Sequence, residues 1–115
     1  TKDNKLGKNA LEILNQADKN NEVIIIPTIV LAEIFYICEK NRVDIKFNDI
    51  LNKINNSSNY VSYDLDMEVI LKLSDLKKIP ELHDRIIVAT AILTNSKILT
   101  KDEHIIKSNY VKTIW

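Results

Sequence analysis

The feature that most restricts the fold is the run Val-Ile-Ile-Ile at residues 23–26, which Pro27 closes. Because no polar residue interrupts the run, it is typical of a strand buried on both faces, as in a parallel sheet. A helical pattern follows at once, from Thr28 to about Lys40. A buried strand that leads directly into a helix predicts an α/β fold.

The same alternation of strand and helix continues to the end of the sequence. Short strands are predicted over residues 60–63, 97–100 and 111–115, and helices over residues 7–18, 47–55 and from near residues 66, 84 and 103. We therefore predict one three-layer α/β/α domain over residues 1–115, in which helices cover both faces of a parallel sheet.

The order of the first elements departs from the usual α/β pattern. Folds of this class normally begin with a central strand, whereas the first element predicted here is the helix over residues 7–18. We therefore expect that the first strand is missing from this chain and that the domain is incomplete at its amino end.

Composition excludes several classes of protein. Lys plus Arg and Asp plus Glu both total 16, so the chain lacks the basic excess of proteins that bind nucleic acid by bulk charge. The only glycine, Gly7, excludes glycine-rich phosphate loops. The single cysteine, Cys38, excludes an internal disulfide and indicates a reducing, cytoplasmic compartment. No apolar stretch approaches the roughly 20 residues of a membrane span, so no membrane association is expected.

Glu33 is the first candidate site residue. It is the only charged residue in the segment IVLAEIFYIC, at residues 29–38. Such a carboxylate either lies at a solvated edge of the helix or is partly buried, where a cation or hydrogen bonds must compensate the lost hydration. Because this helix leaves the end of a strand, where open parallel sheets bind ligands, a cation-binding role is equally open.

Asp84 and Asp102 are the other two candidates. Each has a structural explanation, since Asp84 lies in the first turn of a predicted helix and Asp102 precedes one as a possible cap. Together with Glu33, however, they are expected around one crevice at the carboxyl ends of central strands, where they would repel one another unless a cation neutralised them. Oxygen ligands without His or Cys clusters select Mg²⁺ or Mn²⁺. Thr100 adds a hydroxyl beside Asp102.

Four further residues are assigned mainly structural roles. Asp64 and Asp66 form an Asp-x-Asp after a strand, but a turn residue and a helix cap explain them and are favoured over a metal pair. His83 is a lone histidine without a second ligand of its kind, so it is not assigned as a base. For Arg85, pairing with a carboxylate of the site is favoured over contact with a phosphate.

Three segments carry a resemblance to a known family: PTIVLAEI at residues 27–34, ELHDRIIVATAIL at 81–93 and KILTKDEHI at 97–105. With the closing VKTIW, they resemble the PIN-domain ribonucleases along essentially the whole chain. Many relatives in that family are VapC-type toxins of prokaryotic toxin–antitoxin pairs. Its members typically have a first strand that ends in an aspartate of the acidic cluster, and no residue here matches that aspartate.

The resemblance implies an activity and a set of site residues. Glu33, Asp84 and Asp102 match the catalytic, metal-binding acids, and Thr100 matches the hydroxyl position that often joins them. It implies hydrolysis of RNA phosphodiester bonds with Mg²⁺ or Mn²⁺. It also implies an antitoxin protein as a partner and a homodimer.

Two functions of other classes stay open. The missing first aspartate favours a catalytically inactive PIN-like module that acts as a scaffold or binds RNA or protein. A receiver-like phosphoacceptor domain would also place carboxylates at strand ends. It requires a phosphorylatable aspartate after the third strand, for which only Asp64 is available.

Overall fold

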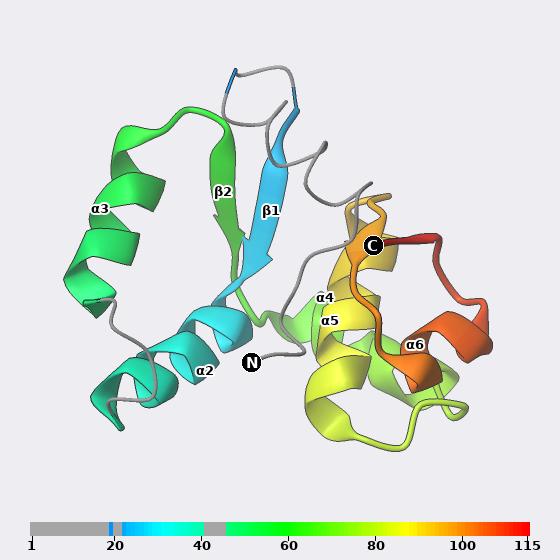
Figure 1. The fold of residues 1–115 in the computed structure, drawn as a ribbon. Helices are drawn as coiled ribbons and strands as arrows, with labels where there is room; N and C mark the ends of the chain where they lie inside the picture. Colours follow the sequence, from blue (N-terminus) through cyan, green and yellow to red (C-terminus); the bar gives the residue numbers. More distant parts are fainter. Residues whose placement is uncertain (1–18, 20–21, 41–45) are drawn as a thin grey trace.

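The structure, a computed structural model, describes residues 19, 22–40 and 46–115. The helix predicted over residues 7–18 lies outside them. The elements, drawn in Figure 1, are β1 (Ile24–Pro27), α2 (Thr28–Glu39), α3 (Phe47–Asn56), β2 (Tyr60–Tyr63), α4 (Met67–Lys72), the 3-10 turn η2 (Leu73–Asp75), α5 (Leu82–Leu93), β3 (Ile98–Leu99), α6 (Glu103–Ser108) and β4 (Thr113–Ile114). The predicted alternation is confirmed for this part of the chain, where no helix is long and apolar enough to cross a membrane.

The strands pair in two separate parallel sheets. β1 pairs with β2, with Ile24 opposite Tyr60, and β3 pairs with β4, with Ile98 opposite Thr113. Parallel strands connected through helices confirm the α/β class. The predicted parallel sheet, expected without its first strand, is divided between β1 and β3, since no strand joins the two pairs among the described residues.

The apolar core lies around α5. Its buried residues come from α4, α5, β3, α6 and the segment between α4 and α5. They are Val69, Leu76, Ile79, Ile86, Val88, Ala89, Ala91, Ile98 and Ile105. Full burial of a Val, Leu or Ile side chain contributes about 1.5–3 kcal/mol, so the stability of the domain depends mainly on this part of the chain.

Strand β1 differs from the prediction that it would be buried on both faces. All four of its residues, 24–27, are only partly buried, and α2 and α3 contain no buried residue. The reason is that β1 has one strand partner, β2, among the residues that the structure describes. Figure 1 shows α3 beside β2, on the far side of the β1–β2 pair from α5 and α6.

The two helices that follow the site segments begin at capping side chains. The Glu81 carboxylate accepts a hydrogen bond from the Asp84 N–H at 2.9 Å, and this cap starts α5. The Asp102 carboxylate accepts one from the Ile105 N–H at 3.0 Å and starts α6. Such caps satisfy N–H groups that the first turn of a helix leaves without a partner, so they determine where each helix begins.

Candidate functional site

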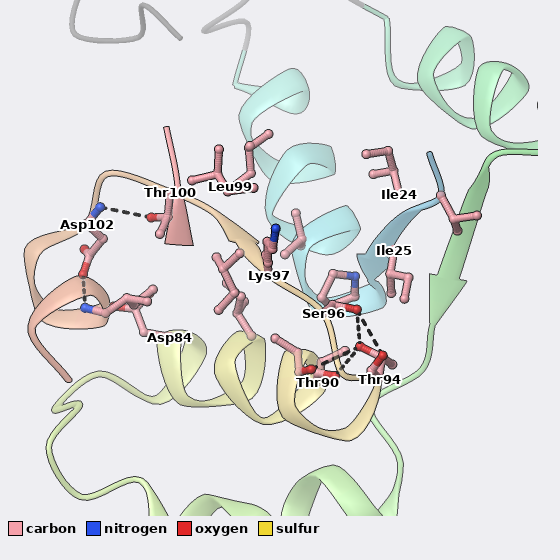
Figure 2. Close-up of a pocket in the computed structure, with 18 of the residues that line it drawn as sticks. Ile24, Ile25, Asp84, Thr90, Thr94, Ser96, Lys97, Leu99, Thr100 and Asp102 are labelled. Atoms are coloured by element: carbon pink, nitrogen blue, oxygen red, sulfur yellow. Dashed lines mark hydrogen bonds between the residues drawn. The ribbon is translucent and has the colours of Figure 1, made fainter. Parts of the chain in front are cut away.

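A cavity of about 750 Å³ lies between β1 and β3. Its sides are formed by β1 and β3, and one face of α5 runs along it. Figure 2 shows that its two ends are polar. One end has Asp84, Thr100 and Asp102, and the other has Thr90, Thr94 and Ser96.

The three predicted carboxylates come from three different elements. Glu33 lies on α2, which follows β1; Asp84 lies in the first turn of α5; Asp102 follows β3 and caps α6. Asp84 and Asp102 line the cavity, whereas Glu33 does not. The two strands thus direct their carboxyl ends to one acidic region, as expected for open parallel sheets.

The charge of this region acts on Asp84. Burial raises the pKa of the Asp84 carboxyl, and the negative charges of Asp102, Glu81 and Glu33 raise it further, in that order. Among the described residues, His104 lowers this pKa. A carboxyl that is partly desolvated among other carboxylates keeps its proton to higher pH than usual, and a bound cation would reverse this effect.

Glu33 is joined to α5 through His83. The His83 Nδ1 atom lies 3.5 Å from the Glu33 Oε2 atom and 3.3 Å from the Glu81 Oε2 atom. The three side chains are 45%, 44% and 52% exposed, respectively, so even with a protonated imidazole each pair contributes less than about 1 kcal/mol. The contacts therefore orient Glu33 toward the first turn of α5 more than they stabilise the fold.

Glu81 was not predicted as part of this region, and His83 was considered only as a base, without its contact to Glu33. A signal for Glu81 exists, because an acid directly after Pro80 and three residues before Asp84 matches the spacing of a capping box. No local signal exists for His83, because its contact with Glu33 depends on the packing of α2 against α5.

Thr100 and Asp102 form a fixed turn after β3. The Asp102 N–H donates a hydrogen bond to the Thr100 hydroxyl at 3.0 Å, and the Asp102 Oδ1 atom accepts from the Ile105 N–H. The capping role considered for Asp102 is therefore real. It does not exclude a second role, because a carboxylate can accept at both oxygens.

The other residues considered from the sequence lie outside this arrangement. Asp66 accepts a hydrogen bond from the Val69 N–H at 3.0 Å, which confirms it as the cap of α4. Asp64 is exposed and does not line the cavity. The Arg85 Nε atom donates to the Ile79 carbonyl at 2.6 Å, and the expected ion pair of Arg85 with a site carboxylate does not form among the described residues.

The end of the cavity that contains Asp84 has the kinds of ligand atom that a hard cation binds. Carboxylate and hydroxyl oxygens are the ligands that Mg²⁺ and Mn²⁺ prefer. Within residues 19, 22–40 and 46–115, however, no group of three His, Cys, Asp or Glu side chains is placed to hold one metal ion. The assignment of Glu33, Asp84 and Asp102 as joint metal ligands and catalytic residues stays a prediction, as does that of Thr100.

Comparison with known proteins gives the family. The family model described as the PIN domain matches residues 1–109. Searches of curated proteins and of solved structures gave no significant match. PIN domains are generally metal-dependent nucleases, and they bind RNA. Since the match covers nearly the whole sequence and agrees with the parallel strands and helices seen here, the chain belongs to the PIN-domain family.

Proposed function

We propose that this protein is a divalent-metal-dependent ribonuclease that hydrolyses RNA phosphodiester bonds. The observation that carries the proposal is the acidic end of the cavity. There, burial and the charges of Asp102, Glu81 and Glu33 raise the pKa of Asp84. Gathered carboxylates destabilise one another, and the arrangement is explained if a cation offsets their charge during function.

In this proposal Asp84 and Asp102 are the first ligands of Mg²⁺ or Mn²⁺, and Glu33 is the third. When bound, the ion activates water and offsets negative charge on the phosphate. The chain's own groups prepare the site. The Thr100 hydroxyl and the Ile105 N–H orient Asp102, and His83 orients Glu33. Without a cation, the Asp84 carboxyl retains a proton to higher pH than an ordinary aspartate.

A biological role as the toxin of a toxin–antitoxin pair is the finer part of the proposal. It is supported by the segments at residues 27–34, 81–93 and 97–105, which resemble those of PIN-domain ribonucleases, a family in which many members are VapC-type toxins. The proposal includes an antitoxin protein and a second copy of the chain as partners. It also includes a cytoplasmic location, which the single cysteine favours.

RNA cleavage by the full protein tests the activity. Labelled RNAs of varied sequence are incubated with Mg²⁺ or Mn²⁺, and parallel samples contain a chelator. Asp84→Asn should lower the metal-dependent rate by about 100-fold or more, because changes in a metal site typically cost 10–100-fold even in its outer shell. The control, Asp64→Asn, alters an exposed aspartate outside the cavity and should leave the rate unchanged. Equal rates for the two variants, or no metal-dependent cleavage at all, would contradict the proposal.

A non-catalytic module that binds RNA or protein is the second candidate. One observation favours it: in the described part of the chain no three acidic or metal-binding side chains converge on one point. Titration calorimetry with Mn²⁺ discriminates the two functions. Heat of binding that Glu33→Gln removes, and that the exposed control Glu39→Gln leaves, supports the nuclease; no heat from the intact protein supports the module.

A further inference from the structure

A basic residue lies inside the turn that carries two of the candidate site residues. Lys101 stands between Thr100 and Asp102, and it is exposed. Both of its neighbours line the acidic end of the cavity. The turn is held by the hydrogen bond from the Asp102 N–H to the Thr100 hydroxyl at 3.0 Å, which Figure 2 shows. The backbone of Lys101 is therefore fixed directly beside the acidic end.

The side chain of Lys101 lies over the ring of Trp115. The Lys101 Nζ atom is 5.5 Å from the ring centroid, a distance at which an ammonium group and an aromatic face attract each other. Trp115 follows β4 directly and is partly exposed. The Thr100 N–H donates to the Ile114 carbonyl at 3.0 Å, so the end of β4 lies next to the turn. The ring thus keeps the ammonium group of Lys101 on the β4 side of the acidic end.

Two other basic side chains near the acidic end have different contacts. Arg85 follows Asp84 in the sequence, but its Nε atom donates to the Ile79 carbonyl at 2.6 Å. The His83 imidazole lies within 3.5 Å of two carboxylate oxygens. Lys101 differs from both, because its charged group lies against an aromatic face and belongs to an exposed side chain. Of these three groups, Lys101 is the one best placed to meet an anion that arrives from solvent.

An RNA strand that crosses the acidic end requires such a cation. Basic and acidic residues both total 16 in this chain, so bulk charge does not attract a polyanion. A metal ion bound at Asp84 offsets charge at the phosphate that is cut, but each flanking phosphate carries a further negative charge. In physiological salt, exposed charges more than about 8 Å apart are largely screened from each other. A cation that binds a flanking phosphate must therefore lie close to it.

We propose that Lys101, held in place by Trp115, binds the RNA phosphate next to the one that is cut at Asp84 and Asp102. The ammonium group donates to a phosphate oxygen, and Trp115 is a positioning residue that orients the lysine. A phosphate contact adds affinity and sets the register of the strand, without a preference among bases. The inference rests on the proposed function for its substrate, RNA, but it concerns binding and not cleavage.

The salt dependence of RNA binding tests the contact. A fluorescein-labelled single-stranded RNA is titrated with the full protein in the presence of a chelator, and anisotropy is measured from about 50 to 200 mM salt. Lys101→Gln should weaken binding by about threefold or more, and the plot of log K against log salt should become less steep by about 0.7, the value for one phosphate on a single strand. Lys112→Gln is the matched control. It removes the same charge from an exposed lysine at the amino end of β4, where its carbonyl accepts from the Ile98 N–H, and should leave affinity and slope unchanged.

Variants of Trp115 test the positioning role. Trp115→Phe keeps an aromatic face and should retain most of the affinity, whereas Trp115→Leu removes the face and should weaken binding. In the Trp115→Leu chain, Lys101→Gln should cost less affinity than in the unaltered chain, because the two residues act as a pair. Trp115 is the only tryptophan, so its emission should also change when RNA binds, and less so in Lys101→Gln. Equal costs of Lys101→Gln in the two chains would overturn the positioning role.

The remaining outcomes separate this inference from the proposed nuclease. Equal affinities and slopes for Lys101→Gln and Lys112→Gln would overturn the phosphate contact, as would a lack of RNA binding by the unaltered protein. Binding that depends on Lys101 in chelator, without cleavage in Mg²⁺ or Mn²⁺, would refute the nuclease and keep the contact. Metal-dependent cleavage with no effect of Lys101→Gln on binding would do the reverse.

Discussion

The region from α4 to α6 and the region from β1 to β2 differ in how completely their apolar side chains are buried. Strand β3 has two residues, yet its Ile98 is buried in the core, whereas the four residues of β1 are all only partly buried. In α2, Phe35, Tyr36 and Ile37 are exposed. The difference shows that an apolar run stabilises a domain only where other elements cover it, and here α5 covers one region more completely than the other.

The largest expected effect is on stability in the α5 region. Ile79→Ala should lower the free energy of unfolding by about 2–5 kcal/mol, because Ile79 is fully buried and its loss leaves a cavity. Ile24→Ala, in the partly buried β1, should cost clearly less. Urea denaturation of both variants gives the two values. Equal losses would remove the contrast between the regions.

Local opening should differ between the regions in the unaltered protein. Amides of α5, such as those of Val88 and Ala89, should exchange about 100-fold more slowly than amides of α2 and α3, because helices without buried residues open without disrupting the core. Hydrogen exchange followed by mass spectrometry measures both sets in one sample. Uniform protection would show that the domain opens as one unit.

The cap bond at the start of α5 should contribute less to the free energy of unfolding than a buried core side chain does. Glu81→Ala removes the acceptor for the Asp84 N–H and should cost about 0.5–2 kcal/mol in the free energy of unfolding. Lys46→Ala is the matched control, since Lys46 occupies the same position at the start of α3 without a side-chain cap bond. Thermal melting compares them. A loss for the control as large as that for Glu81→Ala would mean that the cost does not come from the lost cap bond.

The smallest expected effect is the change in stability with pH that results from the raised pKa of Asp84. Its pKa is raised from the ordinary value of 3.8 by burial, then by Asp102, Glu81 and Glu33. The folded protein therefore binds this proton more tightly than the unfolded chain, and stability decreases as pH rises from about pH 4 through the raised pKa. Asp84→Asn should melt slightly higher than the unaltered protein above this window, with a chelator present. A lower melting temperature at neutral pH would contradict the stated cause.

Much of the fold follows from local pattern. The strand β2 and the caps Asp66 and Asp102 were predicted at the residues where the structure has them, and β1 and α3 to within one residue. Apolar periodicity and capping chemistry depend on nearby residues, so local pattern is enough to predict them. Strands β3 and β4 were predicted longer than their two residues each. Their ends are set by the backbone partner across the ladder, which no local pattern contains.

By itself the sequence determined the α/β class, the alternation of elements and the family, and it placed three carboxylates after strand ends or at a helix start. Only the tertiary structure decided which of them meet. Asp84 and Asp102 share a cavity, while Glu33 contacts His83 through the packing of α2 against α5. The tertiary structure also decided that the sheet is divided between β1 and β3. The physical reason is that pairing, burial and charge interactions depend on distances between segments far apart in the chain, whereas propensity and capping act within a few residues.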